Sequence, residues 1–175
     1  MDRELTEKPV ESAEGQSPNH PGPGRIIALD LGDKRIGIAV TDPLGYTVQP
    51  LMTLYRKAPR ADLKSIARLI RKHGIVEVVV GKPLHMSGEQ SRRAHKAEVF
   101  ANDLHAATGV PVHLWDERLT SWDAHQLLDD TTGRRRTSAD RQKRKQIIDQ
   151  VAAVLILESF LQAREIQRAR EPHAQ

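Results

Sequence analysis

The chain has 175 residues, of which 27 are Lys or Arg and 23 are Asp or Glu, so its formal net charge is +4. This length predicts a single domain with a sizeable hydrophobic core. Cysteine is absent, which excludes a disulfide scaffold, thiol catalysis and cysteine-ligated zinc or iron–sulfur sites. It also suits a reducing compartment, and we expect a cytoplasmic protein. Aromatic residues make up only 3%, which argues against an aromatic platform for single strands.

Membrane insertion and secretion are not expected. The longest unbroken apolar run covers residues 151–157, and it is too short to cross a bilayer. The first residues contain no apolar stretch of the kind found in secretory signals.

The distribution of charge divides the chain into three parts. Residues 1–24 carry a net charge of −3 and the remainder carries +7. This first segment is rich in Pro and Gly and poor in large apolar residues, so we expect a disordered acidic tail. We expect one folded domain over residues 25–163 and a polar C-terminal tail over residues 164–175.

Strand patterns come first in the domain. Apolar runs at 25–31 and 35–41 predict two strands, and a third run at 46–54 contains Pro50, which suits an edge strand. The short polar connections between them contain turn residues. The three strands should therefore form an antiparallel meander.

Helical periodicity and buried-type strands then alternate. Apolar residues at helical spacing predict a helix that ends before Gly74. Further elements follow in chain order: a strand at 75–80, a helix from a capping box at 87–90 to about 108, a strand at 110–115, a short helix at 120–128, a basic loop at 129–145 and a last helix with an apolar stripe. This order predicts an α/β fold, with a mixed five-stranded sheet made of a meander and βαβ crossovers and with helices on both faces.

Three acids stand where they could carry chemistry. Asp30 lies inside an apolar strand, Glu117 follows Asp116 at the end of the fifth strand, and Asp149 lies in the last helix. Sites in mixed α/β sheets gather at the ends of central strands. Three converging carboxylates would require cations, and oxygen ligands suit magnesium or manganese. Two such ions would favour in-line phosphodiester hydrolysis.

Each acid also has a structural explanation. Asp30 could cap the turn at Gly32 or pair with Arg35. The acids at the end of the fifth strand could pair with Arg118 or cap the next helix, and Asp149 could complement a helix dipole. Spacing alone does not bring the three acids together.

Four segments of the chain, taken together, resemble the YqgF/RuvX family, which has been described both as Holliday junction resolvases and as pre-16S ribosomal RNA nucleases. The match runs from about residue 25 to about residue 161. The segments that carry it are 27–42, 79–88, 116–121 and 148–153. This sequence departs from the family pattern at Lys82, His85 and Ser87, where Leu, Asn and Asp are more frequent. Lys82 adds a charge beside the expected cleft, which fits phosphate contact.

The resemblance implies a ribonuclease H-like fold and metal-dependent nuclease chemistry, with Mg²⁺ or Mn²⁺ and two ions expected. It places the catalytic and metal-binding acids at Asp30, Glu117 and Asp149, with Asp30 between the two ions and the other two acids on either side. Adjacent strand residues face opposite ways, so only one of Asp116 and Glu117 can be the ligand, and the family pattern favours Glu117.

Basic residues predict affinity for a polyanion. Residues 133–145 hold seven bases and one acid directly before Asp149, which fits the capture of backbone phosphates beside a cleavage site, although a solvated loop and helix face would look the same. None of these residues is predicted to distinguish bases, so we expect recognition of shape and backbone. The candidate nucleic-acid-binding residues are Lys34, Arg35, Lys82, Arg118, Arg134, Arg135, Arg136, Arg141, Lys143 and Arg144. The eight histidines show no metal-ligand spacing, and only His85 is a candidate proton carrier.

Four functions compete. The resemblance favours processing of the 5′ end of pre-16S ribosomal RNA, with a Holliday junction resolvase as the main alternative. A resolvase should dimerise, because two symmetric cuts need two sites; the sequence leaves monomer and homodimer open. A non-catalytic nucleic-acid-binding module is the third reading. The fourth is an actin-like ATPase, because Asp30, Gly32 and Gly37 also resemble that phosphate loop, but such proteins need two of these domains.

Overall fold

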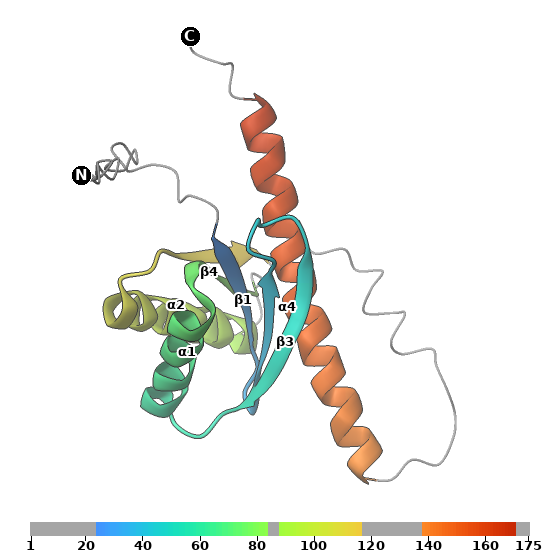
Figure 1. The fold of residues 1–175 in the computed structure, drawn as a ribbon. Coiled ribbons are helices and arrows are strands. Elements are labelled where there is room, and N and C mark those ends of the chain that lie inside the picture. The colour runs from blue at the N-terminus through green and yellow to red at the C-terminus, as the bar shows by residue number, and fades with distance from the viewer. Residues whose placement is uncertain (1–23, 84–87, 117–137, 171–175) are drawn as a thin grey trace, which may run out of the picture.

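The computed structural model describes residues 24–83, 88–116 and 138–170. The described elements are five strands and three helices, which run in chain order as β1 (Arg25–Leu31), β2 (Arg35–Thr41), β3 (Val48–Tyr55), α1 (Pro59–His73), β4 (Ile75–Lys82), α2 (Gly88–Thr108), β5 (Val112–Asp116) and α4 (Ser138–Arg170) (Figure 1).

The strands form one mixed sheet in the order β3-β2-β1-β4-β5. The pairs β1–β2 and β2–β3 are antiparallel, whereas β1–β4 and β4–β5 are parallel. This arrangement confirms the expected meander and crossovers and is ribonuclease H-like. It also places β3 at an edge, as Pro50 predicted, because proline cannot donate a ladder hydrogen bond.

Helices cover both faces of the sheet (Figure 1). On β1, Ile27 and Leu29 belong to the core cluster that includes residues of α1 and α2, whereas Ile26 and Ala28 belong to the cluster that includes residues of α4. The alternation follows from strand geometry, because successive side chains point to opposite faces. By the same alternation, Asp30 lies on the α4 face.

Helix α1 ends as the sequence predicts. Gly74 adopts the left-handed conformation (φ 60°), and its backbone N–H donates to the carbonyls of Arg71 and Ile70. A side chain with a Cβ would be strained there, which is why a glycine stops the helix.

Helix α4 is longer than expected at both ends. It begins at Ser138, inside the segment expected to be a loop over 129–145, and continues to Arg170, past the expected boundary at 163. The sequence of its first turns is rich in charged residues, and its last turns are polar although Arg164 contacts the sheet. The apolar stripe therefore did not predict where the helix begins and ends. The expected 1–24 tail and the expected helix at 120–128 lie outside the described residues, apart from Gly24.

The later part of α4 is anchored to the sheet through Glu77 of β4, whose side chain is only 3% exposed. Arg164 donates to both carboxylate oxygens of Glu77, with Nη1 at 2.9 Å from Oε1, and the Nε2 of His113 lies 3.0 Å from Oε2. The Arg164 guanidinium also lies 4.6 Å above the Phe160 ring. Burial alone would raise the pKa of Glu77, but the hydrogen bonds and charges of His113 and Arg164 outweigh it and lower the pKa to about 2.

Residues 145–170 of α4 are long and apolar enough to cross a membrane, judged by length and composition alone. In the fold, however, Ala153, Ile156, Leu157 and Phe160 are buried against the sheet. These four residues of α4 are thus part of the protein core.

Candidate active site at the contact between the sheet and helix α4

Asp30 and Asp149 approach the same point of the sheet from different elements. In the ladder between β1 and β2, Asp30 is paired with Gly37. Asp149 lies four residues before Ala153 and seven before Ile156, so helical periodicity puts it on the stripe of α4 that faces the sheet. Its backbone rests on Gly37. Two acids separated by 119 positions in the sequence therefore adjoin one glycine.

Gly37 makes this approach sterically feasible. A Cβ placed on Gly37 would lie 3.2 Å from the Cα of Asp149 and only 1.8 Å from its backbone oxygen. The distance of 1.8 Å is far shorter than a van der Waals contact. A glycine inside a strand is otherwise unfavourable, and it commonly marks a close approach of another backbone. The residue thus fixes how closely α4 can lie against β2.

The side chain of Asp149 is held by Arg35, the first residue of β2. The Nε of Arg35 donates to Oδ2 of Asp149, and the two side chains are 20% and 21% exposed. This ion pair links the first residue of β2 to the last helix. A single-oxygen contact leaves the second carboxylate oxygen, Oδ1, available as a ligand.

Polar contacts with β3 hold the beginning of the described part of α4. Thr53 donates its hydroxyl to the carbonyl of Gln146 at 3.1 Å and accepts a hydrogen bond from Gln150 Nε2 at 3.3 Å. The Gln146 side chain also donates to the hydroxyl of Tyr55 at 2.6 Å. These contacts lie within one helical turn of Asp149 on either side and orient that turn over the sheet.

The end of strand β5 shows on which face of the sheet Asp116 lies. Rings of His113 and Trp115 both lie 5.3 Å from the Phe160 ring of α4, so these residues belong to the α4 face. Strand alternation therefore places Asp116 on the opposite face from Asp30. Glu117 lies outside the described residues.

The structure describes the side chains of only three of the ten expected nucleic-acid-binding residues. Lys82 ends β4 on the α2 side, where its Nζ lies 2.5 Å from Glu98 Oε1. Lys34 is exposed in the turn between β1 and β2, and Arg35 is engaged by Asp149. The remaining candidates lie outside the described residues or in the first turns of α4, where only the backbone is described: Arg118, Arg134, Arg135, Arg136, Arg141, Lys143 and Arg144.

The donors fit a hard divalent cation in kind. Within residues 24–83, 88–116 and 138–170, no group of three or more His, Asp or Glu side chains could hold a metal. Asp30 and Asp149 supply carboxylate oxygens, the ligands that Mg²⁺ and Mn²⁺ prefer, from two elements that meet at a glycine. The third expected ligand, Glu117, belongs to the part of the chain that is not described.

Sequence reasoning missed two parts of this site. It did not assign Gly37 a packing role, although a glycine within an otherwise apolar strand was a visible signal. It expected Arg35 to contact nucleic acid or Asp30, and nothing in the spacing could show a pair formed across 114 residues.

Comparison with known proteins identifies the family. Residues 24–163 match the RuvX family, described as Holliday junction resolvase. This match covers most of the chain, and the chain belongs to the RuvX family.

Curated relatives carry a different functional name. A Koribacter versatilis protein named "Putative pre-16S rRNA nuclease" is 46% identical over 145 residues, which cover 83% of this chain and 91% of the relative. A protein of the same name from Pelotomaculum thermopropionicum is 45% identical and covers 78% of this chain and 86% of its own length. Among solved structures, T. thermophilus RuvC in complex with Holliday junction substrate aligns at a TM-score of 0.49 and 12% identity, covering 78% of this chain and 91% of that one.

Proposed function

We propose that this protein is a metal-dependent nuclease that hydrolyses phosphodiester bonds in structured nucleic acid, and that its substrate is the 5′ region of pre-16S ribosomal RNA. The observation that carries the proposal is the meeting of Asp30 and Asp149 at Gly37. Membership of the RuvX family and the names of the curated relatives support it. Such RNA is processed in the cytoplasm, where we place the protein.

Asp30, Asp149 and Glu117 would hold one or two Mg²⁺ or Mn²⁺ ions, and Glu117 is preferred to Asp116 because Asp116 belongs to the opposite face. When bound, such ions activate a water and neutralise charge on the phosphate. The chain's own residues prepare this site. Arg35 fixes one oxygen of Asp149, and the contacts of Gln146 and Gln150 with β3 hold the helix turn that carries it.

The basic segment 133–145 would attract the substrate. It immediately precedes Asp149 in the sequence, and its bases would neutralise backbone phosphates on either side of the bond to be cut. Since phosphate contacts carry no direct sequence information, the shape of the RNA would select the site.

Branched DNA is the second candidate substrate, because the family description names a Holliday junction resolvase. Two symmetric cuts across a junction require two active sites, so this function needs a dimer. Sedimentation or light scattering at assay concentration distinguishes the two, since a monomeric enzyme cannot place two symmetric cuts in one binding event.

The test is cleavage of a pre-16S ribosomal RNA 5′ fragment beside a synthetic four-way DNA junction, each with Mg²⁺, Mn²⁺ or EDTA. We expect metal-dependent RNA cleavage that disappears in Asp30→Asn. Asp116→Asn and Glu117→Gln form a matched pair, and only the second should abolish cleavage. Retained binding without any cleavage by the wild type would overturn the nuclease in favour of a binding module.

A further inference from the structure

A groove opens between α1 and α2 on the sheet face opposite α4. Its volume is about 420 Å³, which lies in the range of sites for small organic ligands. One of its lining residues, Asp33, lies three positions after Asp30, in the turn that follows β1. The residues that matter for its chemistry are Asp33, Lys57, Leu63, Lys96, Val99 and Phe100.

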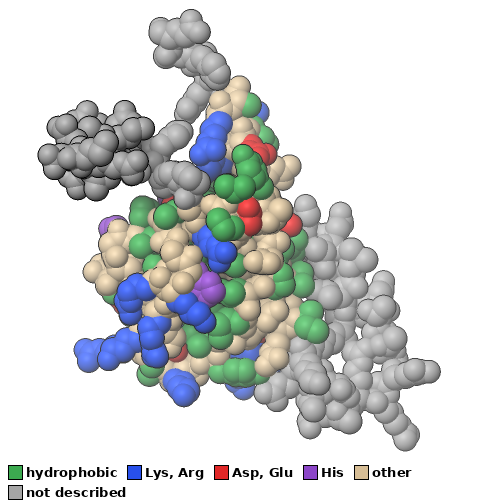
Figure 2. Space-filling model, in the orientation of Figure 1, with side chains coloured by type: hydrophobic (Ala, Val, Ile, Leu, Met, Phe, Trp, Pro, Cys, Tyr) green, Lys and Arg blue, Asp and Glu red, His purple; other side chains and the backbone are tan. Residues whose placement is uncertain are grey.

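The rim of the groove nearest the active-site edge is positively charged. Lys96 Nζ lies 3.3 Å and Arg93 Nη2 lies 3.4 Å from the carboxylate of Asp33, so two cations share one acid. All three side chains are more than half exposed, and the contact with Lys96 is the main cause of a lowered pKa of Asp33. Lys57 adds a further exposed base. Figure 2 shows blue side chains gathered over the face that carries α1 and α2.

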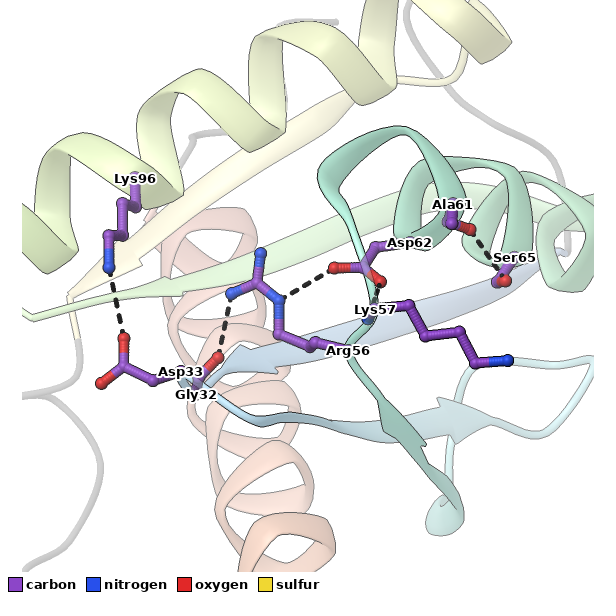
Figure 3. Close-up of polar contacts among 8 residues, drawn as sticks. All are labelled: Gly32, Asp33, Arg56, Lys57, Ala61, Asp62, Ser65 and Lys96. Atoms are coloured by element: carbon purple, nitrogen blue, oxygen red, sulfur yellow. Dashed lines mark hydrogen bonds and ion pairs between the residues drawn. The ribbon is translucent and has the colours of Figure 1, made fainter.

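The buried acid of the groove does not cancel this charge. Asp62 is only 3% exposed and is paired internally, with Arg56 Nε at 2.9 Å and the backbone N–H of Lys57 at 3.1 Å (Figure 3). The Arg56 guanidinium also donates to the carbonyl of Gly32 at 2.9 Å, which ties the wall of the groove to the turn beyond Asp30. The carboxylate of Asp62 therefore serves the framework of the groove.

The interior of the groove is apolar. Val99 of α2 is 45% exposed. It is an apolar side chain on a helix surface whose preceding exposed residues are charged or polar. Leu63 of α1 and the mostly buried Phe100 form the rest of this wall. Asp103, one turn beyond Val99, supplies a carboxylate that can accept a hydrogen bond from an amino group.

We propose that the α1–α2 groove binds an unpaired nucleotide of the RNA strand that continues beyond the cleavage site. The phosphate would lie at Lys96 and the base against Leu63 and Val99, while Lys57 would add positive charge elsewhere along the groove (Figure 3). The cationic rim suits the phosphate, and the apolar wall suits the face of the base. The carboxylate of Asp103 can accept a hydrogen bond from an exocyclic amino group of the base. This inference rests on the proposed function and adds to it a substrate feature, a single-stranded flank.

The test measures binding by fluorescence anisotropy in the cleavage-deficient Asp30→Asn protein, with an RNA hairpin that carries or lacks an unpaired flank. The variants are Lys57→Gln/Lys96→Gln and Val99→Ser. Arg68→Gln/Lys72→Gln on the later part of α1 is the charge-matched control, since both residues are exposed and lie away from the groove lining. We expect wild-type affinity for the flanked hairpin to exceed that for the flankless one.

The groove double variant should lose most of that difference, and the slope of log affinity against log salt for flanked RNA should fall by about 0.7, the value for one phosphate. Val99→Ser should reduce the difference several-fold without changing the slope. Binding of the flankless hairpin should stay within about twofold. Equal losses on both hairpins, an equal loss in the control, or no preference of the wild type for the flank would overturn the proposal.

Failure of the groove and failure of the proposed function are separable. With Asp30 intact, the groove variants should cleave the flankless hairpin at the wild-type rate. If the wild type cleaves no RNA with either metal, the nuclease function fails, whereas the flank-dependent binding still decides the groove.

Discussion

Arg35 at the start of β2 and Asp149 on α4 form an ion pair across 114 residues of sequence, at the point where the helix crosses the sheet. The pair joins the second strand to the last helix, and it lies beside the ladder position of Asp30 and Gly37. A residue expected to bind substrate thus holds a candidate ligand. We therefore treat Arg35 as a positioning residue and not as a catalytic one.

Replacement of Arg35 should weaken metal binding more than it weakens the fold. In Arg35→Met the Asp149 carboxylate loses its orienting donor, and loss of such a partner typically reduces metal affinity by about 10- to 100-fold. Titration with Mn²⁺ followed by electron paramagnetic resonance measures this directly. Arg35→Lys, which keeps the charge without the planar donor, should recover part of the affinity. Unchanged Mn²⁺ affinity in Arg35→Met would show that the ion pair has only a structural role.

Gly37→Ala should displace α4 from the sheet. The new Cβ would overlap the Asp149 backbone, which cannot move as a flexible side chain can, so we expect a loss of about 3 kcal/mol or more in the free energy of unfolding. Urea denaturation followed by tryptophan fluorescence measures the loss. Gly45→Ala is the comparison, because its Cβ meets no atom within 4 Å and only its φ of +76° opposes the change, at a cost of about 1 kcal/mol. Equal losses in the two variants would contradict the close contact.

The stability of the domain should fall in acid through Glu77. Its pKa in the fold is lowered to about 2, so it binds a proton more readily in the unfolded chain. Its contribution is therefore fully present above the ordinary carboxyl pKa and is lost as the pH falls from about 5 towards 2. The loss is on the order of 3 kcal/mol. Denaturation of wild type and Glu77→Gln across that range should show a smaller pH dependence in the variant, and parallel curves would exclude this role.

The basic segment should contribute affinity and not chemistry. Removing three charges in Arg134→Gln/Arg135→Gln/Arg136→Gln should lower RNA affinity and reduce the slope of log affinity against log salt by about 2. The cleavage rate at saturating RNA should remain unchanged. Filter binding at several salt concentrations and single-turnover cleavage measure the two effects, and a lower single-turnover rate at saturation would place these residues in the reaction itself.

The sequence predicted the sheet well because its signals are local. Apolar runs, turn residues and the stop at Gly74 depend on neighbours within a few positions, and the chain order of strands and helices then leaves few topologies. The full length of α4 was not predictable in the same way. Arg164 looks like a polar tail residue until Glu77, 87 positions earlier, is placed opposite it.

The site was predicted only as a set of candidates. Asp30 was conspicuous as a charge inside an apolar strand, but its relation to Asp149 depends on the packing of α4 against Gly37, which no spacing reveals. The face of Asp116 became known only from the contacts of Trp115 and His113 with α4, and the role of Glu117 stays a prediction. Pairings such as Lys82 with Glu98 likewise required the fold.

The position of α4 at the end of the chain determines when, during synthesis, the candidate site becomes complete. The ribosome synthesises all five strands, with Asp30, before it reaches the turn that carries Asp149, and the Arg164 anchor follows later still. A nascent chain that has emerged only through β5 lacks both Glu117 and Asp149, two of the three proposed acids, and the Arg164 contact that anchors α4. The enzyme should therefore be unable to cut RNA while it is itself being translated.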